Sequence, residues 1–345
     1  MSARSSIGPV ALALLMGAFL SAYARTPEGA LGLVRAPHNG QPALVLPGGA
    51  FTALLQERAD VSLVRNGAPV PLNAEPQPRP GGLTAARCQI PEDMQPGPYA
   101  IRAAAESGVD TTVRSVYVLE KFPKYYAVAH ISDVHVGKPL RDGETPMDVL
   151  EAVFTSASVS DAAFALVTGD VTENGKTEQF QRFLALLDTC ALPTFVVAGN
   201  HDRNALNYER FFGRGACMFR FGRDGYLGFD TKDLMVADEL GAQDGLLQRY
   251  RRALKPCRWT VGFTHRYEPM MGMRAQLLLF VDNPLDFLLF GHWHRENTAG
   301  ESVTPWGKTR ISVVPAAIHG KLRVLDMTAI GLVPRPVTEV NVAGE

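Results

Sequence analysis

The sequence predicts an α/β domain that follows a signal segment and a small all-β sandwich. The chain of 345 residues is longer than one hydrophobic core usually supports, which favours two domains. Residues 25–122 read as short strands and turns, whereas strands and helices alternate from Tyr125 onward. Such alternation indicates parallel strands with helices packed outside them.

The composition is that of a globular protein, with 46% apolar and 20% charged residues. The formal net charge is −1, so no strong field of either sign favours nucleic acid or an anionic membrane as a partner. The sequence contains no fixed-period repeat and gives no indication of the oligomeric state.

Residues 1–24 have the pattern of a secretory signal peptide. Arg4 supplies a short positive start, and Ile7–Leu20 is apolar. Ala22 and Ala24 are the small residues required before a cut, which we place after Ala24. An uncleaved anchor helix is the alternative, and the short apolar stretch with its good cleavage site disfavours it. We therefore expect an exported protein, periplasmic or secreted, with no transmembrane segment after cleavage.

Residues 25–122 are expected to form a small β-sandwich, immunoglobulin-like in outline, because turn signals recur about every ten residues without a convincing helix. Val61–Val64 and Pro69–Leu72 flank an Asn-Gly pair and read as a hairpin. Asn73–Leu83 is rich in Pro and Gly and reads as a loop. No catalytic cluster occurs here, so a structural role is favoured over binding of a surface, glycan or substrate.

The four cysteines do not form a dense disulfide framework or a CxxC motif. Export would permit disulfides, and Cys217 and Cys257 are the candidate pair because both lie in the same later region. Cys190 reads as a buried apolar residue, and Cys88 is left without a predicted partner.

Residues 123–345 are predicted to form the second domain. The expected helices cover residues 145–158, 176–190 and 242–254. The expected strands cover residues 126–131, 163–168, 194–198, 259–264, 286–290, 310–314 and 322–326, followed by a hairpin that runs to about Glu339.

Five polar motifs in this domain begin within a residue or two of the end of an apolar strand. They are Asp133-Val134-His135, Gly169-Asp170, Gly199-Asn200-His201-Asp202, His265, and Gly291-His292-Trp293-His294. The carboxyl ends of strands form the edge at which open α/β sheets bind ligands. Strands that are far apart in the sequence can therefore bring these side chains into one small volume.

Seven of the motif side chains suit two divalent ions: Asp133, His135, Asp170, Asn200, His265, His292 and His294. Carboxylate, amide and imidazole ligands together favour manganese, iron or zinc, and the absence of Cys argues against a closed structural zinc site. A carboxylate at a strand end can bridge two ions roughly 3.5–4 Å apart. Such a pair of ions can neutralise a phosphate and activate a water molecule for attack on phosphorus.

Residues of about 125–330 resemble the calcineurin-like metallophosphoesterases, whose signature contains these five motifs in this order. The resemblance implies an α/β (α+β) metallophosphoesterase fold, a two-layered β-sandwich flanked by helices. It also implies two ligand sets that share Asp170 as the bridging residue. The first set is Asp133, His135 and His294, and the second is Asn200, His265 and His292.

The same resemblance implies a dinuclear phosphoester hydrolase with a metal-bridging hydroxide as nucleophile. His201 would contact the phosphate and assist the leaving group without binding metal. Asp202 would orient His201, as a carboxylate that fixes the tautomer of an imidazole.

The subclass is indicated by the residues after Asp170. Purple acid phosphatases have a metal-binding Tyr three residues later, and this chain has Glu173 there. The sequence Val167–Thr172 is similar to the cyclic-nucleotide phosphodiesterase-like branch. This favours a small phosphodiester substrate, such as a cyclic nucleotide or a glycerophosphodiester. A phosphomonoesterase, or an exported binding protein that keeps the fold without turnover, is the alternative.

Overall fold

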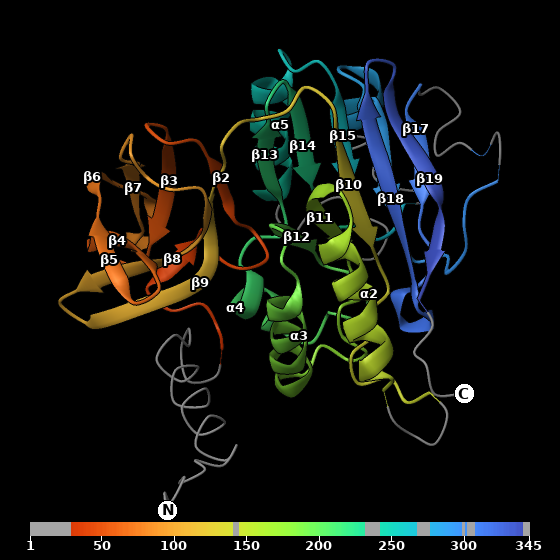
Figure 1. Ribbon diagram of the computed structural model, residues 1–345, viewed down its shortest axis with the longest axis horizontal. Coiled ribbons are helices and arrows are strands. Elements are labelled where there is room, and N and C mark those ends of the chain that lie inside the picture. Colours follow the sequence, from red (N-terminus) through yellow and green to blue (C-terminus); the bar gives the residue numbers. More distant parts are fainter. Residues whose placement is uncertain are drawn as a thin grey trace, which may run out of the picture.

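The computed structural model describes residues 29–140, 145–231, 242–267, 277–298, 301 and 308–340. The signal-peptide segment predicted at 1–24 lies outside these residues. The strands form four sheets, two in the N-terminal part and two in the C-terminal part (Figure 1). Among the helices that the structure describes, none combines the length and apolar character needed to cross a membrane.

The N-terminal part consists of two sheets, ordered β1-β3-β7-β6 and β2-β9-β8-β4-β5. Neighbouring strands pair antiparallel, apart from the parallel pair β2 and β9. Apolar side chains from both sheets, among them Leu55, Leu63 and Ile101, form one buried core. The predicted antiparallel β-sheets are therefore present, whereas the immunoglobulin-like outline stays a prediction. The strands are β1 Val34–Ala36, β2 Ala43–Val45, β3 Ala50–Leu55, β4 Asp60–Arg65, β5 Ala68–Pro71, β6 Asn73–Pro78, β7 Thr84–Gln89, β8 Gly97–Ala105 and β9 Gly108–Val118.

The predicted hairpin is strands β4 and β5. Asn66 and Gly67 connect them with positive φ values of 52° and 79°, as a type I′ turn requires. The predicted loop over Asn73–Leu83 is wrong in part, because Asn73–Pro78 is strand β6 and Pro80–Gly82 is a short 3-10 helix, η1. Strand β6 lies at the edge of its sheet, the position in which a strand tolerates proline.

The C-terminal part contains two five-stranded sheets, ordered β12-β11-β10-β18-β19 and β13-β14-β15-β16-β17. Parallel pairs join β10 to β11, β11 to β12, and each neighbour from β14 to β17, as the alternation predicts. The pairs β10–β18, β18–β19 and β13–β14 are antiparallel. The strands are β10 Tyr126–Ile131, β11 Ala162–Thr168, β12 Thr194–Val197, β13 Cys217–Phe221, β14 Asp224–Gly228, β15 Thr260–Phe263, β16 Phe287–Phe290, β17 Arg310–Val313, β18 Lys321–Thr328 and β19 Gly331–Glu339.

Apolar side chains of both sheets, such as Phe164 and Phe263, form a common core, so the sheets pack face to face. Helices α2 (Met147–Val159) and α3 (Thr177–Thr189) pack Phe154 and Phe180 on the outer side of the first sheet. Helix α5 (Ala242–Leu254) packs on the outer side of the second sheet, where it buries Leu254. The expected two-layered sandwich with flanking helices is therefore the observed fold of this part.

Several short elements were not predicted from the sequence. Helix α4 covers Asn207–Phe212, and β13 and β14 form a hairpin around Gly222. A five-residue π-helix, η2, covers Leu277–Val281, and the 3-10 helix η3 covers Ala317–His319. Each of them is too short for its apolar pattern to show a clear helical or strand period.

The suggested disulfide between Cys217 and Cys257 is wrong, because all four cysteines are free. Cys217 lies opposite Gly228 of β14, whereas the Cys257 sulfur lies beside Gly225 of the same strand. Three residues along a strand span about 10 Å, which exceeds the reach of a disulfide.

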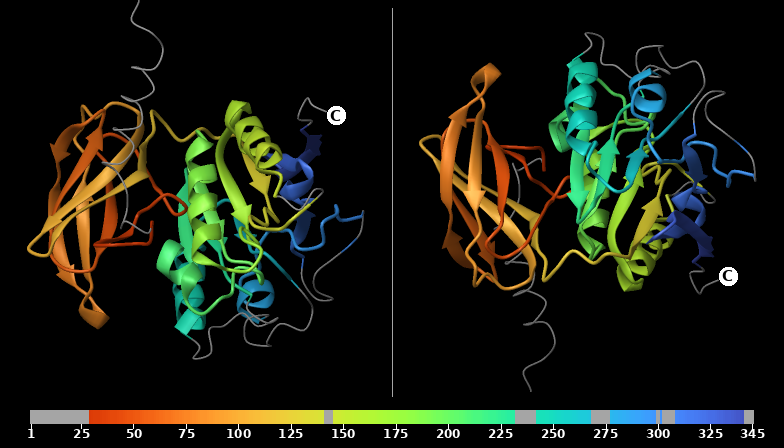
Figure 2. Two further views of the ribbon diagram at one scale, coloured as in Figure 1. Left: turned by 90° about the horizontal axis from the view of Figure 1, so that it is seen from below. Right: turned by 90° about the horizontal axis from the view of Figure 1, so that it is seen from above.

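The N-terminal part lies beside the C-terminal part (Figure 2). It contacts the edge strand β12 through Gly40. Gly40 forms a parallel bridge with Phe195, and its carbonyl accepts a hydrogen bond of 2.7 Å from the Val196 N–H. The buried imidazole of His38 lies with its Nε2 3.1 Å from the Phe212 carbonyl oxygen. Strand β12 leads directly into the Gly199 turn, so the N-terminal part supports a strand that positions part of the site.

Candidate metal centre

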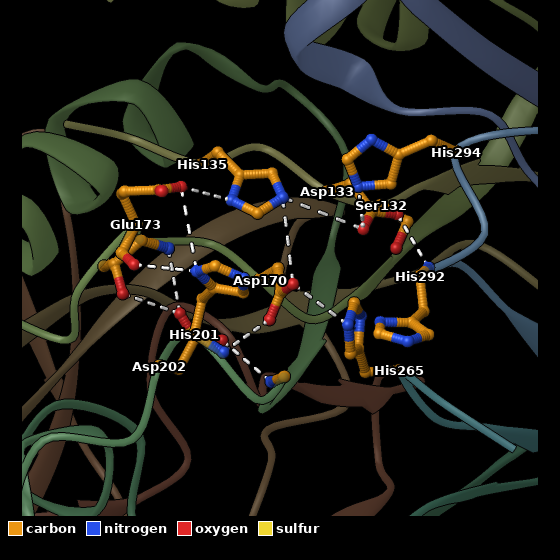
Figure 3. A network of polar contacts seen from close by, with 12 residues as sticks. Ser132, Asp133, His135, Asp170, Glu173, His201, Asp202, His265, His292 and His294 are labelled. Atoms are coloured by element: carbon orange, nitrogen blue, oxygen red, sulfur yellow. Dashed lines mark hydrogen bonds and ion pairs between the residues drawn. The ribbon is translucent and has the colours of Figure 1, made fainter. Parts of the chain in front are cut away.

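The five predicted motifs follow strands β10, β11, β12, β15 and β16 and meet at the edge where these strands end (Figure 3). The first three strands belong to one sheet and the last two to the other. The backbone N–H of His292 donates to Asp133 Oδ2 at 2.9 Å, which ties the loop after β16 to the loop after β10. The site therefore spans both sheets.

The backbone turns sharply at several of these residues. Five non-glycine motif residues have positive φ, between 48° and 63°: Asp133, His135, Asp170, His292 and His294. Positive φ is uncommon outside glycine, and such residues cluster at functional sites. The unusual backbone conformation is therefore concentrated at predicted metal ligands.

The first ligand cluster contains Asp133, His135 and His294, whose ligand atoms lie within 4.8 Å of one another. Asp133 Oδ1 is 3.2 Å from His294 Nε2 and 3.9 Å from His135 Nε2. Asp133 and His135 are buried, while the His294 side chain is 34% exposed. One carboxylate oxygen and two imidazole nitrogens thus converge on one point that is accessible from a single side.

The second cluster contains Asp170, His265 and His292. His265 Nε2 lies 3.0 Å from Asp170 Oδ2, and its Nδ1 donates to the Thr168 carbonyl oxygen at 2.8 Å. The same Asp170 oxygen is 3.7 Å from His135 Nε2 of the first cluster. Asp170 therefore lies between the two clusters, in the position of a shared ligand.

Three buried polar atoms at the centre have no hydrogen-bond partner among the described residues: Asp133 Oδ1, His135 Nε2 and His265 Nε2. Buried polar atoms are nearly always paired, so these atoms indicate a missing partner. Carboxylate and imidazole donors suit manganese, iron and zinc. The residues present therefore fit two divalent ions.

The charges of the metal-free site show the same need for a cation. Burial alone would lower the pKa of His265, but the adjacent Asp170 carboxylate raises it to about 9. Burial would raise the pKa of Asp170, and His265 outweighs this effect and lowers it to about 2. Burial and the neighbouring His265 lower the pKa of His292 to about 4. In the absence of metal, a proton on His265 thus balances the buried carboxylate.

The Gly199 turn places Asn200 and His201 at the rim of the centre, where Asn200 is exposed. The backbone N–H of His201 donates to Asp170 Oδ1 at 2.8 Å. The His201 ring donates from Nδ1 to the Glu173 carbonyl oxygen at 2.9 Å, because a carbonyl can only accept. With a side chain 39% exposed, His201 presents Nε2 as its remaining polar atom.

The expected role of Asp202 as the partner of His201 does not agree with the structure. The Asp202 carboxylate is fully buried and accepts bonds from the backbone N–H groups of Val171, Thr172 and Gly199 and from the Thr172 hydroxyl. Asp202 thus ties the loop after β11 to the loop after β12, because its carboxylate points into the protein while His201 points outward. Burial, and then the nearby Asp170, raise the pKa of Asp202 to about 6.

Glu173 contacts the centre, although none of the five sequence motifs contains it. Its Oε2 lies 2.7 Å from His135 Nδ1. The segment that contains Glu173 is held beside the first motif by a bridge between Val136 and Thr172. A signal was present in the sequence, because Glu173 occupies the position of the metal-binding Tyr of purple acid phosphatases.

Comparisons with known proteins agree with this geometry. Residues 126–296 match the family model described as calcineurin-like phosphoesterase, so this region is a calcineurin-like phosphoesterase domain with buried His and Asp metal-binding clusters. A probable glycerophosphodiester phosphodiesterase GpdQ from Arcobacter nitrofigilis is 28% identical over 90 residues. The match covers 25% of this chain and 33% of that protein, so the chain spans about a third of the relative's length.

The chain was also compared with solved structures. Purple acid phosphatase PPD1 from yellow lupin seeds has a TM-score of 0.52 and 14% identity, with 83% of this chain and 69% of that chain covered. A structure of PhoD has a TM-score of 0.45 and 9% identity, with 84% and 79% covered. At this identity the lupin structure supports the metallophosphoesterase fold alone.

Proposed function

We propose that this calcineurin-like phosphoesterase domain hydrolyses phosphodiesters with two divalent ions bound. The observation that supports this most strongly is the pair of ligand clusters on either side of Asp170, with three buried atoms that lack a partner. One cluster would hold an ion with Asp133, His135 and His294. The other would hold an ion with Asp170, His265 and His292, to which Asn200 adds an amide oxygen.

The chemistry follows from the two clusters and from His201. Two divalent ions bound by these residues would supply positive charge for the phosphate and would lower the pKa of a water molecule for attack on phosphorus. His201 donates its Nδ1–H to the Glu173 carbonyl, so Nε2 is the ring nitrogen left to face the substrate. Nε2 can give a proton to the leaving oxygen when the ring carries a second proton, and the ring then keeps the proton on Nδ1. The backbone N–H of His201 holds Asp170 against this loop, and Gly199 permits this close approach because it has no Cβ.

We propose a small phosphodiester as substrate, such as a glycerophosphodiester or a cyclic nucleotide. The similarity to a probable glycerophosphodiester phosphodiesterase supports this choice. A diester carries less negative charge than a monoester, so it needs fewer cationic side chains beside the two ions. The first alternative is a phosphomonoesterase, and the second is a non-catalytic binding protein on the same fold.

The proposal is tested by hydrolysis of bis(p-nitrophenyl) phosphate and p-nitrophenyl phosphate with the purified protein. We expect faster cleavage of the diester, loss of activity after chelation, and recovery on addition of manganese, iron or zinc. Asp170→Asn should remove activity toward both compounds. Faster monoester cleavage would support the phosphatase alternative, and tight metal binding without turnover of any phosphoester would support the binding protein.

We further propose that the protein is exported and that its N-terminal β part is an immunoglobulin-like sandwich with a structural role. The export proposal is supported by the signal pattern of residues 1–24. N-terminal sequencing of protein recovered from the periplasm or the medium tests it. We expect Arg25 as the first residue, whereas recovery of the intact leader in the membrane fraction would contradict cleavage.

A further inference from the structure

Glu173 lies directly beside a member of the first ligand cluster. Its Oε2 is 2.7 Å from Nδ1 of His135, and its side chain is 21% exposed (Figure 3). A carboxylate oxygen can only accept here, so His135 donates its Nδ1–H to Glu173. This bond places the only ring proton of a neutral His135 on Nδ1 and leaves the lone pair on Nε2.

The other nitrogen of the same ring faces the metal centre. His135 Nε2 is buried without a hydrogen-bond partner and points toward Asp133 Oδ1 at 3.9 Å and Asp170 Oδ2 at 3.7 Å. Glu173 therefore lies on the opposite side of the imidazole from the ion that Nε2 would bind. Its carboxylate contacts the ligand and not that ion.

The distance also argues against a metal ion between Glu173 and His135. Although Glu173, His135 and His201 lie close enough to be considered as a ligand group, two ligand atoms on one zinc-like ion stand roughly 3 Å or more apart. The Glu173 to His135 separation of 2.7 Å is instead that of a charge-assisted hydrogen bond. The Nδ1 atom of His201 is bonded to the backbone carbonyl of Glu173.

We propose that Glu173 is a positioning residue that holds His135 in the Nδ1–H tautomer, with Nε2 directed at the metal. The inference rests on the proposed dinuclear site and adds a residue to it. A carboxylate behind a metal-binding histidine fixes the ring orientation and raises the basicity of the ligand. The effect of Glu173 is therefore on metal affinity and not on bond cleavage itself.

The side chain and the backbone of Glu173 can be tested separately. The carboxylate bonds to His135 at 2.7 Å and lies 3.8 Å from His201 Nδ1, whereas the backbone carbonyl accepts the hydrogen bond of His201 at 2.9 Å. The backbone is anchored independently, by a bond of 3.0 Å from the Glu173 N–H to the Val136 carbonyl. A side-chain substitution should therefore change the metal cluster while His201 keeps its partner.

The experiment compares Glu173→Ala and Glu173→Gln with Glu178→Ala, an exposed carboxylate five residues further along the chain. Metal affinity is measured by competition with a chelator, and the tautomer of His135 by proton–nitrogen correlation NMR of the metal-free protein. We expect Glu173→Ala to bind two ions, with the affinity for the ion at His135 lowered about 10- to 100-fold. In this variant His135 should no longer be found in the Nδ1–H tautomer alone. Glu173→Gln should have an intermediate metal affinity, because its amide oxygen can still accept a hydrogen bond from His135 Nδ1–H. Glu178→Ala should have the metal affinity and the His135 tautomer of the wild type.

At saturating metal, we expect the kcat of Glu173→Ala to stay within about tenfold of wild type, since His201 keeps its hydrogen bond to the backbone carbonyl of residue 173. Loss of one ion from Glu173→Gln would show that Glu173 is a ligand and would overturn the inference. Unchanged affinity and unchanged tautomer in Glu173→Ala would also overturn it. If the wild-type protein bound no metal, the proposed function would fail, while the NMR tautomer of His135 would still test the role of Glu173.

Discussion

Gly199→Ala is a sharp test of how closely the loops after β11 and β12 must approach. A Cβ atom at Gly199 would lie 2.1 Å from Asp170 Oδ1 and 2.2 Å from the Asp170 backbone nitrogen. Real Cβ atoms essentially never approach other heavy atoms within 3.0 Å, so the shared carboxylate or its backbone must move by about 1 Å. Metal sites tolerate deviations of only about 0.2 Å in ligand distance.

We therefore expect Gly199→Ala to weaken metal binding at least about 100-fold, because it displaces the ligand that both ions share. Overpacking at this buried position should also cost about 1–3 kcal/mol of the free energy of unfolding. Chelator competition measures the metal affinity, and thermal unfolding in excess chelator measures the stability without the contribution of metal. Phosphodiester hydrolysis should fall in parallel with metal occupancy.

Gly245→Ala is the matched control. A Cβ atom there has no neighbour within 4 Å, and the residue lies inside helix α5. This variant should keep the metal affinity of the wild type. Its free energy of unfolding should rise by up to about 1 kcal/mol, because alanine has a higher helix propensity than glycine. If folded Gly199→Ala bound two ions as tightly as wild type, the close approach of these loops would not matter to the site and the reasoning would be refuted.

Three further predictions concern the site and the thiols. Asn200→Ala should weaken the binding of one ion. His201→Ala should keep both ions bound and slow turnover about 10²- to 10⁴-fold. Metal analysis and kinetics of each variant test this, and loss of metal from His201→Ala would show that His201 is a ligand. The raised pKa of metal-free His265 means that its pair with Asp170 stabilises the metal-free protein below pH 6.5, and this contribution is lost as the pH rises through 9. Metal affinity should then rise about tenfold per pH unit up to about pH 9, because the metal displaces the proton of His265. Calorimetry at pH 7 in buffers of different ionisation heat should detect the released proton. A metal affinity that does not depend on pH would contradict this prediction. Thiol titration should find four free thiols after unfolding and only the partly exposed Cys257 reactive before it, while fewer than four would indicate a disulfide.

The sequence was sufficient to predict most of the fold that positions the site. Apolar runs located strands β10, β11 and β12, and helical spacing located α2, α3 and α5 within about two residues of their observed ends. The seven proposed ligands were found because each follows such a strand, and parallel strands end at one edge of a sheet. Long periodic segments and their ends are the features that residue patterns determine most directly.

The contacts made inside the site required the structure. Asp202 stands next to His201 in the sequence, yet its carboxylate accepts bonds from backbone groups of the loop after β11. Glu173 reaches His135 although 38 positions separate them, because Val136 and Thr172 form a bridge between their loops. The direction in which a side chain points at a left-handed turn depends on tertiary packing, and a sequence motif does not specify that packing.

The proline-rich segment at Asn73–Pro78 was misjudged for a related reason. Proline cannot donate to a ladder, so Pro76 and Pro78 argued against a strand. The segment nevertheless pairs with β7 because it lies at the edge of its sheet. Whether a strand is central or at an edge is a property of the assembled sheet and is not contained in the local sequence.

The central claim is that two divalent ions bind on either side of Asp170. Anomalous X-ray diffraction from crystals soaked in manganese, recorded at the manganese edge, would test it most directly. We expect two anomalous peaks roughly 3.5–4 Å apart, one in contact with Asp133, His135 and His294 and the other with His265 and His292, with Asp170 reaching both. A single peak, or peaks away from these side chains, would contradict the dinuclear site.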